Sequence, residues 1–232
     1  MQTSHAVQPD IIINCIGVIK QIPSAMDPLK AITLNALFPH RLSIVSQTVG
    51  ARLIHISTDC VFNGKKGMYT ENDQSDAIDL YGRTKFLGEV AYPHCVTLRT
   101  SIIGHELNQH RGLLEWFLAQ TQTVKGFRKA IYSGFPTIEL ARIIRDYVMP
   151  NPELSGVYNV SSEPISKYDL LRLVAVRYDK AIHIEPYDDF VLDRSLDSTI
   201  FREKTDYRYP SWDEMIEMMH NDFWVNRSYY TA

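Results

Sequence analysis

The sequence predicts an α/β protein with a doubly wound parallel sheet, followed by a small C-terminal α+β lobe. Three short runs rich in apolar and β-branched residues lie at 10–17, 52–56 and 95–103, and segments with helical periodicity separate them. This order of strand, helix, strand, helix, strand is typical of right-handed crossovers in a parallel sheet. Beyond Gly104 the expected elements become shorter and mixed. We therefore expect a sheet domain over 1–104 and mainly a separate lobe over 105–232, with a soft boundary because the chain can cross back.

The elements of the first half follow from their apolar patterns. The run from Asp10 to Gly17 is continuously apolar and ends in glycine, which indicates a strand buried on both faces. Helical periodicity follows over 27–49, and Pro39 is expected to kink that helix. The remaining elements of this half are a strand at 52–56, a helix at 79–91 and a strand at 95–103.

The second half is predicted from shorter signals. It is expected to contain helices at 112–120 and 137–148, strands at 156–160 and 182–185, and two further helices that begin near Ser166 and Ser211. Ser166 with Asp169 and Ser211 with Glu214 have the spacing of a capping box, which marks the start of a helix.

Composition excludes several classes of protein. The 232 residues are 45% hydrophobic and 22% charged, which is ordinary for a globular protein. A formal net charge of -3 gives no broad basic surface for nucleic acid, and no apolar stretch approaches the length of a membrane span. Cys15, Cys60 and Cys95 have no C-x-x-C spacing and lie in or beside apolar runs. A reducing cytoplasm fits this pattern.

A metal site is not expected. His105-Glu106 and His110 come near the zinc-helix motif, but the second histidine is five positions after the first rather than four. That spacing turns the two rings apart on a helix.

The residues after the strand at 52–56 and those of the next helix predict a catalytic site. Ser57-Thr58-Asp59 follows the strand directly, and ligands of open α/β sheets bind beyond the carboxyl ends of strands. Tyr81 and Lys85 are four positions apart, which places them on one helix face, one turn apart. A nearby cation favours the phenolate, and moving the pKa of a phenol about 3 units needs roughly 4 kcal/mol. The pair therefore suits proton donation to a carbonyl oxygen.

A purely structural interpretation of the same spacing stays open on these residues alone. Y-x-x-x-K is a loose pattern, and it also occurs in amphipathic helices whose lysine snorkels to solvent. The position of Thr58 at a strand end favours the functional interpretation.

The ordered motifs resemble those of the extended short-chain dehydrogenase/reductases, most closely the dTDP-4-dehydrorhamnose reductase branch. The matching motifs are Ile13-Asn14-Cys15-Ile16-Gly17, Ser57-Thr58-Asp59-Cys60-Val61-Phe62-Asn63-Gly64, Tyr69-Thr70-Glu71-Asn72-Asp73, Tyr81-Gly82-Arg83-Thr84-Lys85 with Gly88-Glu89, Leu98-Arg99-Thr100-Ser101, and 156–168. The resemblance implies a partial Rossmann-type NAD(P)-binding domain over 1–104 and a substrate-binding lobe over 105–232. It implies NADP or NAD as cofactor and reduction of the 4-keto group of a nucleotide-activated deoxysugar, in surface-polysaccharide sugar biosynthesis. A nucleotide sugar is the expected partner, and a homodimer is compatible with the resemblance.

The resemblance also implies residue roles. Tyr81 is expected to be the general acid, Lys85 to hold the nicotinamide ribose and lower the pKa of Tyr81, and Thr58 to hydrogen-bond the same ketone oxygen. Asp59 is expected within reach of the substrate. The implied cofactor-binding residues are Cys15, Ile16, Gly17, Asn35, Ser57, Tyr81, Lys85, Thr100 and Ser101. For Asn35 two interpretations stay open, a water relay to the lysine or a local helix-interior bond.

The sequence departs from the family pattern in two places. The family often has an aromatic residue where Cys60 and Ile102 stand, so the sugar is left open. No G-x-G-x-x-G motif occurs, and Gly64 and Gly67 are followed by Thr70 at the third position. We therefore expect a fragment that begins at the family's fourth strand, binds NAD(P)H poorly and exposes an apolar strand edge.

Two alternative functions remain on the sequence alone. A non-catalytic, cofactor-binding regulatory subunit would not need Thr58, Tyr81 and Lys85 together. A nucleotide-sugar epimerase is a further alternative, as is a dehydratase, although dehydratases usually place an acidic pair beside the threonine. Here Cys60 follows Asp59.

Overall fold

A four-stranded parallel sheet lies at the centre of the larger of the two parts of the molecule. The structure is a computed structural model, and it describes residues 7–19, 27–107 and 111–230. The sheet contains β1 (Ile11–Asn14), β2 (Arg52–Ile56), β3 (Cys95–Arg99) and β8 (Gly156–Asn159), in the order β1-β2-β3-β8. All three pairings are parallel. The predicted α/β class with a parallel sheet is confirmed.

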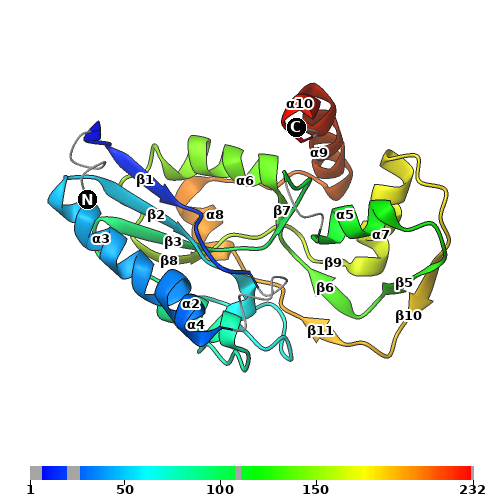
Figure 1. Ribbon diagram of the computed structural model, residues 1–232, viewed down its shortest axis with the longest axis horizontal. Coiled ribbons are helices and arrows are strands. Elements are labelled where there is room, and N and C mark those ends of the chain that lie inside the picture. Colours follow the sequence, from blue (N-terminus) through cyan, green and yellow to red (C-terminus); the bar gives the residue numbers. More distant parts are fainter. Residues whose placement is uncertain (1–6, 20–26, 108–110, 231–232) are drawn as a thin grey trace.

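Helices cover both faces of this sheet, as Figure 1 shows. One face carries α2 (Pro28–Ala31), η2 (Ile32–Leu37), α3 (Phe38–Thr48) and α4 (Leu80–Leu87). The other carries α6 (Thr137–Ile143), η4 (Ile144–Val148) and α8 (Thr199–Thr205). Alternation along β2 explains the two layers, because Leu53 packs with Val90 and Cys95 while Ile54 joins the main core. None of the described helices has the length and apolarity to cross a bilayer.

The smaller lobe is built from short strands and helices (Figure 1). Its strands are β4 (Ile102–Ile103), β5 (Val124–Phe127), β6 (Ala130–Tyr132), β7 (Phe135–Pro136), β9 (Ile165–Ser166), β10 (Ile184–Tyr187) and β11 (Leu192–Asp193). They pair as β10-β5, β11-β6-β9 and β4-β7. Its helices are α5 (Leu113–Ala119), α7 (Lys167–Arg177), α9 (Trp212–Val225) and α10 (Arg227–Tyr230).

The chain returns twice to the first half after Gly104. β8 completes the main sheet beside β3. The segment after β11 then lies along the loop that follows β2: Tyr69 N donates to Ser195 O (2.9 Å), and Asp197 N donates to Tyr69 O (2.8 Å). The division into two domains at Gly104 stays a prediction.

Three expected elements differ in detail. The strand expected to be buried on both faces is β1, which lies at the edge of the described sheet with Ile13 43% exposed. The helix over 27–49 has its irregularity at the π-helical η2, just before Pro39. Pro39 lacks the N–H that would bond to the Asn35 carbonyl in a regular α-helix, so the hydrogen-bonding pattern changes there. The strand expected over 95–103 is interrupted, because Ser101 O accepts a bond from Phe135 N (2.9 Å) and β4 pairs with β7 instead of continuing β3.

Candidate functional site

The carboxyl ends of β1, β2 and β3 lie at one edge of the sheet and bring most of the predicted site residues together. Parallel pairing places the segments 15–17, 57–59 and 100–101 side by side at that edge. Ser57 N donates to Leu98 O (2.8 Å), and Asp59 N donates to Thr100 O (3.1 Å). These backbone bonds fix the turn that carries Thr58.

The helix α4 brings Tyr81 to this turn. Asp79 caps α4 by accepting a hydrogen bond from Gly82 N (2.8 Å). A Cβ atom at Gly82 would lie 2.2 Å from Cys60 O, so glycine lets the first turn of the helix approach the turn after β2. Thr58 caps the short helix η3 (Asp59–Val61) by accepting from Cys60 N (3.1 Å). The first turn of α4 therefore packs against the Thr58 turn.

Tyr81 is a protonated phenol at neutral pH. Burial raises the pKa of Tyr81, charge repulsion from Cys60 raises it further, and a hydrogen bond with Thr58 opposes these effects. Lys85 is not among the groups that shift this pKa, so the lowering by Lys85 expected from the sequence is not found here. A protonated phenol is the form that a general acid needs.

Lys85 points to β2. Its Nζ donates to Ile56 O (2.7 Å), and the residue is only 5% exposed. Burial lowers the pKa of Lys85 to about 8, while electrostatic interactions with Glu89 and Cys15 oppose that shift. An ammonium group has three donors, and Ile56 takes one of them.

Asn35 joins the loop after β1 to α4. Its Oδ1 accepts from Val18 N (2.8 Å), and its Nδ2 donates to Val18 O (3.0 Å) and to Thr84 Oγ1 (3.3 Å). These partners lie 17 and 49 residues away in sequence, so the local helix-interior bond left open above is not what the structure contains. Through these bonds Asn35 fixes Val18, and with it the loop after β1, against α4.

The predicted cofactor-binding residues after β1 lie beside the Lys85 amine. Cys15 and Gly17 are exposed, and Ile16 is 54% exposed. A Cβ atom at Gly17 would lie 3.1 Å from Asn35 Oδ1 and 4.0 Å from Lys85 Nζ. A bare backbone beside an ammonium fits the close approach of a ribose.

Thr100 and Ser101 complete the predicted set in the interruption between β3 and β4. Thr100 is buried, and its Oγ1 donates to Ser101 O at 3.4 Å. They reach the same sheet edge as Thr58 through the Asp59–Thr100 backbone bond.

Three features near the site were not assigned a role from the sequence. Glu89 and Arg99 form a buried ion pair behind Ser57. The sequence signal that could have indicated this pair is Arg99, the single charged residue at the end of the apolar strand β3. Burial raises the pKa of Tyr132, and the nearby charge of Asp59 raises it further. No local pattern marks Tyr132, because its neighbours are distant in sequence.

Arg194 is the third feature. Its Nε donates to Phe62 O (2.8 Å), and its Nη1 donates to Cys60 Sγ (3.7 Å). The Arg194 guanidinium is thereby fixed beside the turn that Tyr81 approaches. Arg194 and Cys60 are 134 positions apart in sequence.

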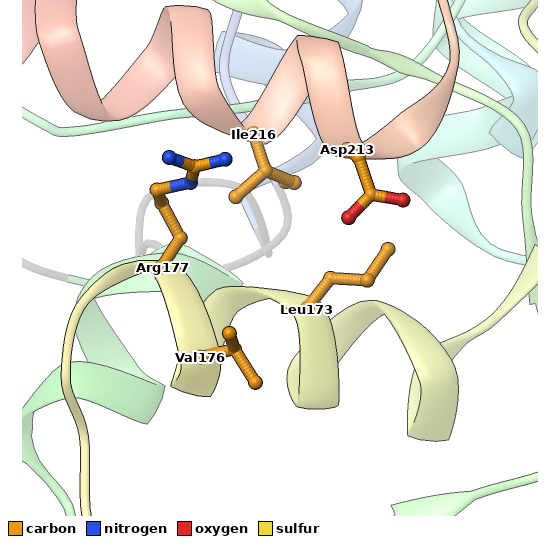
Figure 2. Close-up of a pocket in the computed structure, with 5 residues that line it drawn as sticks. All are labelled: Leu173, Val176, Arg177, Asp213 and Ile216. Atoms are coloured by element: carbon orange, nitrogen blue, oxygen red, sulfur yellow. The ribbon is translucent and has the colours of Figure 1, made fainter.

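Two surface cavities lie away from the predicted site. Figure 2 shows one of about 340 Å³ between α7 and α9, with Arg177 and Asp213 at opposite ends of an apolar floor that includes Ile216. A second, of about 420 Å³, is lined by Thr199, Arg202, Glu203, Asp206, Tyr207, Arg208 and Tyr209. The part of the chain that the structure describes holds no cluster of three metal ligands, and His110 of the near-zinc motif lies outside the described residues.

The chain is similar in sequence to two curated proteins with different names. Methionine adenosyltransferase 2 subunit beta of Rattus norvegicus is 26% identical over 207 residues, which cover 80% of this chain and 60% of that protein. Spore coat polysaccharide biosynthesis protein SpsK of Bacillus subtilis is 30% identical over 169 residues, covering 69% and 58%. The chain thus spans less than two thirds of the length of these curated relatives.

A solved structure shares the fold over nearly the whole chain. The dTDP-4-dehydrorhamnose reductase of Bacillus anthracis, crystallised in complex with NADP, has a TM-score of 0.82 and 22% identity, and the match covers 95% of this chain and 83% of that one. The profile of the family described as RmlD substrate binding domain matches residues 1–223. The chain therefore belongs to the RmlD substrate binding domain family.

Proposed function

We propose that this chain carries the catalytic residues of an NAD(P)H-dependent reductase that acts on the 4-keto group of a nucleotide-activated deoxysugar. The observation that carries the proposal is the convergence of Thr58, Tyr81 and Lys85 at the carboxyl edge of the sheet. The family membership and the fold shared with a dTDP-4-dehydrorhamnose reductase support it. The name of the Bacillus subtilis relative supports a place in polysaccharide biosynthesis.

In the proposed reaction each side chain has one task. Tyr81 donates its phenolic proton to the ketone oxygen, and Thr58, which is hydrogen-bonded to Tyr81, stabilises the developing alkoxide. Lys85 holds ribose hydroxyls of the cofactor with the donors that Ile56 does not use. A reduced nicotinamide supplies the hydride when it is bound.

The backbone of 15–17 is the proposed floor of the cofactor site. Gly17 leaves the space in front of Lys85 open, and Asn35 holds the following residue, Val18, by both backbone polar groups. Ser57, Thr100 and Ser101 complete the proposed cofactor-binding set at the neighbouring strand ends. Either NADP or NAD is compatible with these residues.

The proposed sugar site lies between this edge and the smaller lobe. Asp59 faces Tyr132 closely enough to affect its pKa, which burial raises, and Arg194 reaches Cys60 from the segment after β11. These side chains come from both parts of the chain. We propose that together they surround the sugar beside Tyr81.

A second candidate function is a cofactor-binding subunit of another enzyme. The observation that favours it is the relative named methionine adenosyltransferase 2 subunit beta. The presence of Thr58, Tyr81 and Lys85 together favours the enzyme. An epimerase would also keep these three residues. Product analysis distinguishes the two activities, because only the reductase causes net oxidation of NAD(P)H.

The proposal is tested by Tyr81→Phe in a version of the protein that carries an added glycine-rich NAD(P)-binding segment before residue 1, because the sequence alone predicts poor NAD(P)H binding. We expect NADPH-dependent reduction of a dTDP-4-dehydro-6-deoxysugar to fall by about 10²–10⁴-fold, because general acid catalysis has that magnitude. NADPH affinity, measured by calorimetry, should stay unchanged. The control is Tyr92→Phe, which alters an exposed tyrosine hydrogen-bonded to His40.

Two results would contradict the proposed function. Full turnover in the Tyr81→Phe protein would exclude Tyr81 as the acid. Cofactor binding without any reduction of nucleotide sugars by the wild-type protein would favour the subunit instead.

A further inference from the structure

Glu89 is a buried carboxylate that lies behind the proposed catalytic turn. It follows Gly88, the C-cap of α4, and stands four positions after Lys85. Its Oε1 accepts from Ser57 Oγ (2.8 Å) and from Arg99 Nε (2.9 Å), and its Oε2 accepts from Arg99 Nη2 (2.8 Å). The side chains of Arg99 and Glu89 are 5% and 4% exposed. Three hydrogen bonds to a buried carboxylate fix its position.

Glu89 and Lys85 hold consecutive residues at the end of β2. Lys85 Nζ donates to Ile56 O (2.7 Å), and the carboxylate of Glu89 accepts from the hydroxyl of Ser57, the next residue. Thr58 follows directly. Two side chains from the end of one helix therefore fix the two residues that precede the proposed catalytic threonine.

We propose that Glu89 is a positioning residue for the proposed reduction, which keeps Lys85 in its ammonium form and holds the Ser57–Thr58 turn in place. This inference rests on the proposed function for its catalytic meaning. Its physical content concerns the charge state of Lys85, which can be measured without any substrate.

The electrostatic step follows from the groups around Lys85. Cys15 after β1, His55 on β2 and Glu89 after α4 are the titratable groups that interact electrostatically with the amine. Burial lowers the pKa of Lys85 to about 8, and the charge of Glu89 is the first of the effects that oppose this lowering. Without that charge, the amine would lose its proton at a lower pH. A neutral amine is a poorer partner for ribose hydroxyls and for a phenolate.

The cation of Arg99 offsets the free-energy cost of burying the Glu89 carboxylate. A charge taken out of water costs several kcal/mol unless a partner neutralises it, and Arg99 supplies two parallel bonds. The Arg99 guanidinium also lies over the Phe62 ring, 5.2 Å from its centroid, and that ring stacks on Tyr69 at 4.1 Å. Replacing Glu89 and Arg99 together avoids the single unpaired buried charge that replacing Glu89 alone would leave.

The test is a titration of Lys85 Nζ by NMR in protein labelled with ¹⁵N-lysine, with the signal assigned by Lys85→Arg. We expect a midpoint near 8 in the wild type and a decrease of roughly one unit in Glu89→Gln. Because Glu89→Gln leaves Arg99 buried without its partner, the double variant Glu89→Gln with Arg99→Met is measured beside it. A smaller decrease is expected there, because removing the cation of Arg99 partly offsets removing the anion of Glu89. Glu89→Asp, which keeps the charge, should restore much of the wild-type midpoint, and Glu203→Gln on the exposed side of α8 is the control.

A folded Glu89→Gln variant whose Lys85 titrates as in the wild type would overturn the proposal and leave Glu89 as a structural residue only. In an active protein, the alkaline limb of the kcat/KM profile should move to lower pH in Glu89→Gln by the same shift as the NMR midpoint. A limb that stays in place while the NMR midpoint moves would show that the charge of Lys85 does not limit turnover. Absence of reductase activity would refute the proposed function, while the NMR result would still decide the role of Glu89.

Discussion

His55 shows how a single ionisable residue can be buried beside the site at a cost that depends on pH. It is fully buried on β2, and Asn14 of the neighbouring β1 contacts its Nδ1 at 3.0 Å. Burial and the charge of Lys85 lower the pKa of His55 to about 3, although a backbone hydrogen bond with Asn14 opposes this lowering. The ring is therefore neutral in the folded protein at neutral pH.

This burial predicts acid sensitivity. The folded state binds fewer protons than the unfolded state between about pH 6.5 and 3, so the free energy of unfolding falls as the pH drops through that window. Between pH 7 and pH 4 the loss from His55 is about 3 kcal/mol. We expect His55→Gln to remove this part of the acid dependence in urea unfolding, although the variant is less stable at pH 7. His183→Gln, at an exposed position, is the matched control. An acid dependence as steep in His55→Gln as in the wild type would assign the effect to other groups.

At the scale of single elements, α9 shows how a local signal fixes the start of a helix. Ser211 Oγ accepts from Glu214 N (3.4 Å), and Ser211 N donates to Glu214 Oε2 (2.8 Å), which completes the capping box expected from the sequence. The helix buries Met215, Ile216 and Met219 in the main core. The cap therefore sets where that apolar stripe begins.

Ser211→Ala is expected to lower the free energy of unfolding by about 1 kcal/mol, because the first-turn N–H groups lose their acceptor. Ser211→Asp provides an acceptor again and should recover most of the loss. The measurement is equilibrium unfolding in urea at one pH. Equal stability of the alanine and aspartate variants would show that the packing of α9, and not the cap, determines its contribution.

The elements that could be predicted are those whose signals are local. The second strand was predicted with the bounds of β2, and the helix that carries Tyr81 was predicted to begin at its N-cap, Asp79. The strands β6, β9 and β11 were not predicted, because two or three residues carry no periodicity. β11 exists through its pairing with β6, where Leu192 lies opposite Ala130.

The residues of the candidate site also divide into those with a local sequence signal and those without one. Thr58, Tyr81 and Lys85 follow from short motifs near a strand end, and the structure brings them to one edge of the sheet. Tyr132 and Arg194 were missed because only the folding of the lobe brings them near Asp59 and Cys60. The direction of the Lys85 side chain also depends on the fold, because its acceptor is a backbone oxygen of β2.

At the scale of the whole molecule, the two parts of the chain share one core. Ile54, Val96 and Leu98 of the main sheet pack in the same cluster as Phe201 and Met219 from the last third of the chain. The sheet also needs β8, which comes from beyond Gly104. Residues 1–104 alone would expose the face of the sheet that this cluster covers.

We therefore predict that a polypeptide of residues 1–104 does not fold by itself. Its ¹H–¹⁵N NMR spectrum should lack dispersion, and co-expression with residues 105–232 should restore a dispersed spectrum for both parts. The intact chain is the reference. A dispersed spectrum of the isolated 1–104 segment would show that the sheet folds without β8 and α8.

The contact between the segment after β11 and the loop after β2 has a consequence for biosynthesis. Met68 N donates to Ser195 Oγ (2.8 Å) across 127 positions of sequence, so the contact closes late, and contacts of this range slow folding. On the ribosome, the loop that leads into Tyr81 lacks these partners until residues 195–197 have emerged. Phe62 and Tyr69, which are 0% and 3% exposed once folded, are open to chaperones during that interval. Translational pausing before residues 195–197 emerge would lengthen the time that the loop spends unprotected.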